Sequence, residues 1–167
     1  AESNDGYTAL MYVFMRVYFQ KEEQHVDDIV KLLLGAGADP NIKNRQKHYG
    51  GMSALAFACK YGKDDSAIIL IDYEADPLSL DFSNNTILSR AVMNGCIKTV
   101  ARLLTIDDVD VNVQNKYGNT ALMTACQGNH YEVVKLLLKA GADILLLNKD
   151  NDNAIKKLFP YRHMRGN

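Results

Sequence analysis

This chain of 167 residues lacks an excess of charge of either sign, and it has few cysteines. Lys and Arg number 19 against 20 Asp and Glu, so the net charge is −1. Neither a global basic excess nor a polybasic stretch points to nucleic acid or to an anionic membrane. Three cysteines are too few for a secreted disulfide framework. We therefore expect a reducing intracellular compartment, the cytoplasm, with the nucleus left open.

Long apolar runs are also absent. The longest lies between Ala9 and Phe19 and is interrupted by Arg16, which is well short of the roughly 20 residues that cross a bilayer. We therefore expect no membrane insertion. The first residues lack the basic region of a signal peptide. Because no initiator Met is present, we expect a piece or a processed product of a longer protein.

Internal repetition dominates what is present. A Thr or Ser followed by Ala-Leu or Ile-Leu recurs at Thr8, Ser53, Thr86 and Thr120, with spacings of 45, 33 and 34 residues. A further step of 33 reaches Asn153. A second motif follows each marker: residues 133–143 match residues 29–39, and both end in Ala-Gly-Ala-Asp. A period of 33 to 34 residues is typical of a repeat architecture.

On these motifs, the chain resembles the ankyrin-repeat family over nearly its whole length. The resemblance implies an all-α solenoid of stacked helix-turn-helix pairs joined by hairpin loops, in a single domain spanning residues 1–167. Its repeats would be about 4–44, with an insertion, then 45–81, 82–115 and 116–148, followed by a partial capping repeat at 149–160. The family's Pro after the Thr is replaced in every repeat, and the third repeat lacks the closing Gly-Ala-Asp.

The fourth repeat shows how the pattern predicts a helix pair. Residues 121–128 predict a first helix with Thr120 at its N-cap, where the hydroxyl can accept a backbone N–H. Residues 131–140 predict a second helix with a wide apolar face. Asn129 and Gly141 are the predicted helix ends, because both residue types tolerate a left-handed conformation. Helices this short do not hold alone in water, so each repeat must pack on its neighbours.

The first repeat carries about eight extra residues between its helices, and it is apolar nearly all round from Tyr12 to Phe19. One interpretation is an atypical capping repeat whose long helix folds over the end of the core. The other is an exposed apolar ridge that contacts a partner, a second copy of the chain, or sequence that precedes this piece in a longer protein. Both interpretations remain open at this point.

The sequence contains no recognisable catalytic constellation. No histidine has a partner at metal-ligand spacing, and neither a Cys-x-x-Cys nor a phosphate-binding glycine loop occurs. We therefore expect no enzyme, no cofactor and no metal site. Cys59 and Cys126 are expected to be buried and inert. Cys96 begins a second helix, where a helix N-terminus could instead make the thiol reactive.

The resemblance implies that a partner protein binds on the concave side, which is built from hairpin tips and outer positions of the first helices. Tyrosine at such positions is typical of binding hot spots, although each Tyr could instead pack against its own turn. The residues at these positions are Tyr7, Tyr49, Met52, Lys60, Tyr61, Phe82, Asn85, Met93, Asn94, Tyr117, Asn119 and Gln127.

The resemblance also implies a possible modification. Many ankyrin hairpins are substrates of a 2-oxoglutarate-dependent asparaginyl hydroxylase, with a Leu eight residues before the Asn. Asn41 and Asn112 have that spacing. A further open feature is the basic C-terminal tail with Lys156, Lys157, Arg162 and Arg165, for which a solvated cap is favoured over contact with an acidic surface.

The function that we expect is that of a non-catalytic protein-interaction module within a longer protein. Two alternatives remain. The chain could be the regulatory or substrate-recruiting arm of a multidomain enzyme or a pathogen effector. It could also be a scaffold that self-associates through the apolar stretch between Tyr12 and Phe19.

Overall fold

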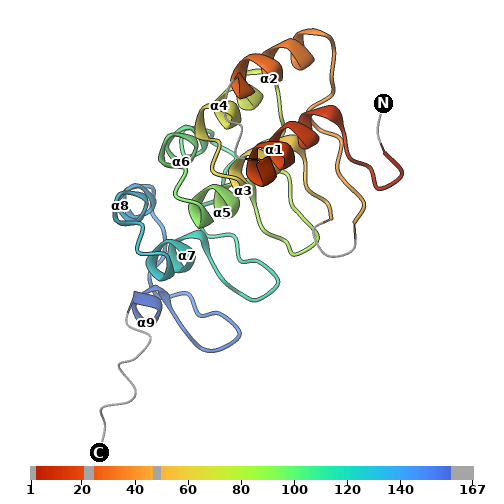
Figure 1. Cartoon of the computed structure of the whole chain (residues 1–167). Helices are drawn as coiled ribbons and strands as arrows, with labels where there is room; N and C mark the ends of the chain where they lie inside the picture. Colours follow the sequence, from red (N-terminus) through yellow and green to blue (C-terminus); the bar gives the residue numbers. More distant parts are fainter. Residues whose placement is uncertain (1–2, 21–24, 47–49, 159–167) are drawn as a thin grey trace, which may run out of the picture.

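The computed structural model describes residues 3–20, 25–46 and 50–158. Within these ranges the chain forms helices in two rows (Figure 1). The first row contains α1 (Ala9–Gln20), α3 (Ala54–Lys60), α5 (Ile87–Met93), α7 (Ala121–Gln127) and α9 (Ala154–Leu158). The second row contains α2 (Val26–Gly35), α4 (Asp64–Asp72), α6 (Ile97–Leu103) and α8 (Tyr131–Lys139). The predicted all-α solenoid is confirmed.

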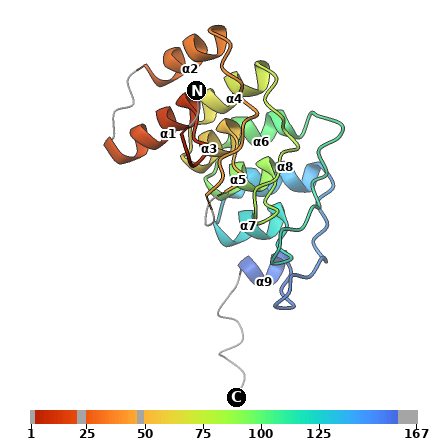
Figure 2. The same cartoon turned by 90° about the vertical axis from the view of Figure 1, so that its right-hand side faces the viewer.

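Successive repeats pack row against row. Each first helix contacts the next first helix along the chain, and each second helix contacts the next second helix. The connections from a second helix to the following first helix project to one side as long hairpin loops, which we call fingers (Figures 1 and 2). The fingers span residues 36–53, of which 47–49 lie outside the described residues, 73–86, 104–120 and 140–153. The row of first helices and the fingers therefore meet at an angle. The second helices lie in the other row, which we call the outer row.

A polar side chain caps the N-terminus of the first helices. Ser53 accepts a hydrogen bond from the Ala56 N–H, and Thr86 and Thr120 do the same for the third residue after them. Asn153 caps α9 in the same way, with 3.0 Å between the Lys156 N and its Oδ1. These contacts satisfy N–H groups that would otherwise lack a partner at the helix start.

The helix ends follow the predicted residues. Asn129 and Gly141 follow α7 and α8 with φ angles of 55° and 85°, and Gly62 and Gly95 follow α3 and α5 with φ angles of 68° and 65°. The predicted helices at 121–128 and 131–140 are observed at Ala121–Gln127 and Tyr131–Lys139. The third repeat has lost the Gly that ends its second helix, and α6 instead continues into two tight turns, from Arg102 to Thr105 and from Leu103 to Ile106.

Polar side chains also join neighbouring repeats. The Asp64 carboxylate accepts the backbone N–H groups of Lys98 and Thr99 at 2.9 and 2.7 Å, so a residue of α4 caps the start of α6. At the base of the fingers, Asn41 accepts the Asp76 N–H at 2.7 Å and donates to the Glu74 carbonyl at 3.1 Å. Asn112 makes the equivalent pair of contacts with Asp143 and Gly141.

The first repeat differs from the others in the length of α1, which has 12 residues against seven in α3, α5 and α7. Leu10, Met11 and Phe14 on its inner side are fully buried in the core. Tyr18 and Phe19, in its last two turns, are 62% and 71% exposed. The inner side of the helix therefore closes the end of the core, as the capping interpretation predicts, while the outer side carries exposed aromatic rings whose contact with a partner or a second copy stays a prediction.

Candidate functional site

The surface in the angle between the fingers and the first helices is the candidate site, and we call it the concave face. Its central feature is a groove of about 380 Å³ between the third and fourth repeats. The groove brings together residues from α5, from α7 and from the two fingers that precede these helices. Its lining residues are Asn85, Met93, Asn115, Tyr117, Asn119, Thr124, Gln127 and Gly128.

The predicted partner-binding residues therefore meet in part at one place. Met93, Tyr117, Asn119 and Gln127 all line the groove. Tyr117 stands at the finger tip with the Lys116 ammonium 5.0 Å from its ring centroid. Lys116 was not among the predicted residues, and the adjacent cationic and aromatic side chains at a hairpin tip are the signal that could have identified it.

Side-chain amides hold the floor of the groove in place. Asn115 Oδ1 accepts the backbone N–H groups of Tyr117 and Asn119 at 2.9 and 3.0 Å, which closes the finger tip. Asn115 Nδ2 donates to Asn85 Oδ1 at 2.9 Å, and Asn148 Nδ2 donates to Asn119 Oδ1 at 2.7 Å. The fingers are thus connected to one another by amide pairs. The groove is lined by preorganised polar groups beside the exposed Met93 and Tyr117.

One buried ion pair lies beside the groove. Asp81 occupies the finger position held by Asn115 in the next repeat, and its carboxylate accepts from Arg90 Nε at 2.9 Å. Asp81 is 3% exposed and Arg90 is 16% exposed. Burial alone would raise the pKa of the Asp81 carboxyl, but hydrogen bonds from Asn85 and Arg90 outweigh it and hold this pKa below its ordinary value.

Aromatic rings cluster at the N-terminal end of the concave face. The Tyr18 and Tyr61 rings lie 4.8 Å apart between centroids, and the Phe57 ring is 6.0 Å from Tyr61. The Lys60 ammonium lies 5.2 Å from the Tyr61 centroid and 5.9 Å from that of Phe57. This cluster joins the end of α1 to the end of α3, so the extended first helix contributes directly to the concave face.

Three predicted partner-binding residues do not present their side chains at the surface. Tyr7 is buried with its ring 5.8 Å from Phe57, and Met52 has no exposed surface at all. Asn85 is buried in the network with Asp81 and Asn115. These side chains are buried because Tyr7 and Met52 belong to the hydrophobic core and Asn85 bonds to its neighbours at the floor of the groove, so a role of any of them in partner binding stays a prediction. Tyr49 lies outside the described residues.

The other predicted residues lie at the surface to different degrees. Phe82, Met93, Asn94, Tyr117 and Gln127 are exposed, whereas Lys60, Tyr61 and Asn119 are partly buried. The Phe82 ring covers Gly50 and Gly51, where an added Cβ would lie within 3 Å of the ring. Glycine at these two positions therefore lets the second and third repeats approach at the finger tips.

The two predicted modification sites lie at the base of the fingers, away from the groove. The Asn41 and Asn112 side chains make the inter-repeat contacts already described. Hydroxylation of either residue stays a prediction.

The cysteines offer no reactive thiol. Cys59, Cys96 and Cys126 are free and buried. Burial, together with the nearby Asp64 carboxylate, raises the pKa of Cys96 to about 12. The interpretation of Cys96 as a reactive thiol is therefore wrong, because its neighbours bury the sulfur and so outweigh the helix N-terminus. Within the described ranges, no group of three or more His, Cys, Asp or Glu side chains could hold a metal ion.

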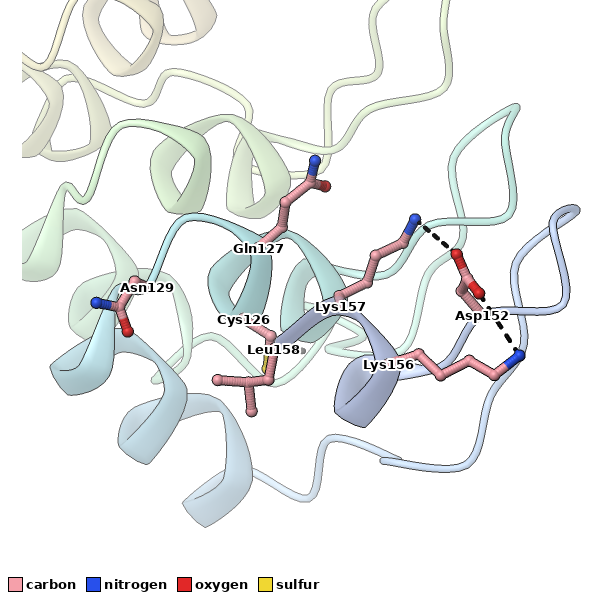
Figure 3. Close-up of a pocket in the computed structure, with 7 residues that line it drawn as sticks. All are labelled: Cys126, Gln127, Asn129, Asp152, Lys156, Lys157 and Leu158. Carbon is pink, nitrogen blue, oxygen red and sulfur yellow. Dashed lines mark ion pairs between the residues drawn. The ribbon is translucent and has the colours of Figure 1, made fainter. Parts of the chain in front are cut away.

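A second pocket, of about 350 Å³, lies between α7 and α9 at the C-terminal end (Figure 3). Lys156 and Lys157 both reach the Asp152 carboxylate, with nitrogen-to-oxygen distances of 3.6 and 3.2 Å. Cys126 and Leu158 form an apolar part of the wall. Both lysines of the predicted basic tail thus have a local counter-ion, while Arg162 and Arg165 lie outside the described residues. Among the helices described, none is long and apolar enough to cross a bilayer.

Comparison with known proteins gives a consistent result. A family model described as ankyrin repeats (3 copies) matches residues 14–115 and 84–148. The chain is 34% identical over 124 residues to an ankyrin repeat-containing protein of Treponema pallidum, a match that covers 73% of this chain and 40% of that protein. It is 28% identical over 138 residues to an ankyrin repeat protein of fowlpox virus, covering 77% and 65% respectively.

A third relative is the B-cell lymphoma 3 protein homolog of Mus musculus. It is 28% identical over 134 residues, which cover 80% of this chain and 30% of that protein. The chain therefore spans between 30% and 65% of the length of these three relatives.

Proposed function

The chain belongs to the ankyrin-repeat family, whose repeats are in general protein–protein interaction modules, and from this premise we propose that it binds a partner protein through its concave face. The family is in general non-enzymatic, and the proposed role of this chain is non-catalytic. Fold alone does not assign a site, so the proposal depends on the residues that the concave face presents.

The observation that carries the proposal is the groove between the third and fourth repeats. Met93, Tyr117, Asn119 and Gln127 reach it from two first helices and one finger that are far apart in the sequence. Tyr supplies contact area and a polar hydroxyl at low entropic cost, and amides supply directional hydrogen bonds. The amide pairs that connect the fingers fix the groove before a partner arrives, which reduces the ordering cost of binding.

In a longer protein, the same surface would recruit a substrate or a regulator to a neighbouring domain. This alternative uses the same concave face and differs only in what the module is attached to. The relatives that the chain covers in part are compatible with such an arrangement.

A second candidate function is self-association through the outer side of α1. Tyr12, Tyr18 and Phe19 are all exposed on this one helix. Exposed aromatic side chains that lie together mark interaction surfaces more often than isolated ones do.

Site-specific photo-crosslinking tests the proposed function. A benzophenone amino acid replaces Tyr117 at the groove or Tyr131, which is exposed at the start of α8 in the outer row. We expect a lysate of the source cells to give a discrete crosslinked partner from position 117 and none from position 131. The two sites are matched, because each native tyrosine is exposed and has a lysine ammonium within about 5 Å of its ring.

The opposite pattern contradicts the proposal. A partner crosslinked from position 131 and not from position 117 would place the binding surface on the outer helices. Circular dichroism of both substituted chains should match that of the unmodified chain, since neither side chain is part of the buried core.

A further inference from the structure

Carboxylates gather where the fingers leave the second helices. Residues 73–80, 104–114 and 140–147 are the first halves of the last three fingers, and we call them the finger bases (Figure 1). They contain no Lys or Arg, whereas the first helices contain no Asp or Glu. The exposed acidic residues of the finger bases are Glu74, Asp76, Asp107, Asp108, Asp110 and Asp143. No residue of the finger bases lines the groove.

These six carboxylates have no cation of their own. Among the described residues, none of them lies within ion-pair distance of a Lys or Arg. Asp76, Asp110 and Asp143 each use one oxygen to accept the backbone N–H two residues later, at 2.9, 2.8 and 2.7 Å. The turn thus fixes each carboxylate and leaves its second oxygen to solvent. The C-termini of α4, α6 and α8 adjoin the finger bases and add partial negative charge.

A few cations border the finger bases without neutralising them. The Lys43 ammonium donates to the Leu80 carbonyl at 3.2 Å. Arg102 lies 3.9 Å from Asp72, which is not one of the six carboxylates. Lys139 is the last residue of α8. The lysines of the last three fingers lie beyond the bases, toward the tips. The finger bases therefore keep an excess of negative charge.

A row of exposed leucines lies next to the carboxylates. In the fourth finger, Leu145 and Leu147 are 69% and 52% exposed, whereas Leu146 between them packs against the core. In the second finger, Leu78 and Leu80 are 47% and 40% exposed. In both fingers the exposed leucines follow the Asp by two and four residues. From the second helices outward, each of these fingers thus presents a carboxylate and then an apolar surface.

The third finger joins the two leucine pairs. Asn112 and Gln114 stand two and four residues after Asp110, at the positions that the leucines occupy in the other two fingers. Gln114 Nε2 donates to the Leu147 carbonyl at 2.9 Å, which places this finger against the fourth. The finger bases therefore form two parallel rows across the last three repeats, one acidic and one of leucines and uncharged amides.

A further repeat at the end of the stack does not account for the leucines. Leu78 and Leu80 lie on an inner finger, and they stay exposed although the third finger follows them. An anionic membrane surface does not fit either, since the carboxylates would repel it. Exposed apolar side chains that lie together beside unpaired charges favour contact with a protein segment of the opposite charge.

We propose that the finger bases bind a basic amphipathic helix of a partner protein, with its apolar side chains on the leucine row and its Lys or Arg side chains against the acidic row. A helix fits two parallel rows because it carries apolar residues in one stripe and charged residues along the edge of that stripe. This surface is separate from the groove, so the inference goes beyond the proposed function and does not rest on it.

A counter-selected library tests the inference. A phage library of random 16-residue peptides is selected on the whole chain after removal of phage that bind a four-serine variant: Leu78→Ser, Leu80→Ser, Leu145→Ser and Leu147→Ser. We expect the enriched peptides to carry several Lys or Arg, with apolar residues at spacings of three and four. Circular dichroism of the variant should match that of the unmodified chain, because all four side chains are exposed.

Variants of the acidic row test the charge. Asp76→Asn with Asp108→Asn should weaken binding of a fluorescent enriched peptide about threefold to tenfold. Asn keeps an oxygen that can accept the Leu78 N–H, so the turn is preserved. Asp5→Asn with Asp150→Asn is the matched control, since both carboxylates are exposed and lie outside the finger bases. Raising NaCl from about 50 to 300 mM should weaken binding more in the control than in the acidic-row variant.

Several outcomes would overturn the inference. Enriched peptides without an excess of Lys and Arg would reject the basic partner, and a selection without enrichment would reject the finger bases as a docking surface. Peptides that lose binding in Met93→Ala and not in the acidic-row variant would lie in the groove instead. A mean mass above that of one chain, lost in the four-serine variant, would show that the finger bases pair two copies. Crosslinking from position 117 tests the concave face separately from all of these results.

Discussion

At the scale of single residues, one finger position shows how a charge replaces an amide. Asn44, Asp81, Asn115 and Asn148 each accept a backbone N–H within their own finger. Three of them are amides and need no counter-ion. Asp81 carries a negative charge in the same buried position, and Arg90 neutralises it. Asp81 and Arg90 therefore depend on each other, whereas the three Asn residues do not depend on a cation.

Removing Arg90 should expose this dependence. Arg90→Met leaves the Asp81 carboxylate buried without its cation, and we expect the free energy of unfolding to fall by about 2 to 4 kcal/mol. Adding Asp81→Asn to that variant should restore part of the loss, because Asn performs the same role in the other fingers. Urea denaturation at pH 7 measures both effects. A double variant no more stable than Arg90→Met would contradict this account.

The pH dependence provides a second measurement on the same pair. The pKa of Asp81 is lower in the folded chain than in the unfolded one. The pair therefore contributes stability that is present above about pH 4 and is lost as the pH falls through the folded-state pKa. The double variant should lack this part of the acid-induced loss of stability. Equal pH profiles for both proteins would show that Asp81 does not contribute.

At the scale of elements, the contacts between fingers alternate along the chain. Asn41 and Asn112 each follow an Asp by two residues and bridge to the next repeat. In the second repeat the equivalent residue is Leu78, which is 47% exposed and cannot make such a bridge. This bridge joins the first repeat to the second and the third repeat to the fourth. It is therefore missing between the second and third repeats.

Leu78→Asn should supply the missing bridge. By equivalence with Asn41, the new amide would meet the Asp110 N–H and the Asp108 carbonyl, and we expect a gain of about 0.5 to 1 kcal/mol. The midpoint of urea unfolding measures it. Leu145→Asn is the control, since within the described residues no finger follows the fourth repeat. An unchanged midpoint for Leu78→Asn would show that the irregular turn after α6 displaces Asp110.

Element positions could be predicted because their signals are local. Thr120 and Asn129 flank α7 in the sequence, and the helix lies between them as expected. Burial at the fingers could not be predicted in the same way. Met52 and Asn119 each lie one residue before the Ser or Thr that caps a first helix, yet Met52 is fully buried and Asn119 is partly exposed. The groove likewise depends on which fingers pair through Asn115 and Asn148, a contact between residues about 30 positions apart.

At the scale of the whole molecule, α1 ends the stack with a surface of its own. Its inner side closes the core, and its last turns extend along the end of α3, where Tyr18 meets Tyr61. The exposed rings of Tyr12 and Phe19 remain available to a second copy of the chain.

Sedimentation equilibrium tests self-association through α1. If the exposed side of α1 pairs two copies, the mean mass should rise above 18.6 kDa between about 10 and 500 μM protein. Tyr18→Ser with Phe19→Ser should then remain monomeric, because both rings are exposed and their loss leaves the core intact. A constant mass for the unmodified chain would remove self-association as a function and leave the concave face unaffected.

The uneven charge of the two rows also has an effect before any contact forms. The first helices contain no Asp or Glu, whereas acidic residues such as Glu74, Asp76 and Asp107 lie where the connections leave the second helices, so the molecule is an electric dipole even though its net charge is −1. The field of such a dipole orients an approaching charged molecule during diffusion. The arrangement therefore acts mainly on how often encounters are correctly oriented, and dissolved salt screens that effect beyond about 10 Å.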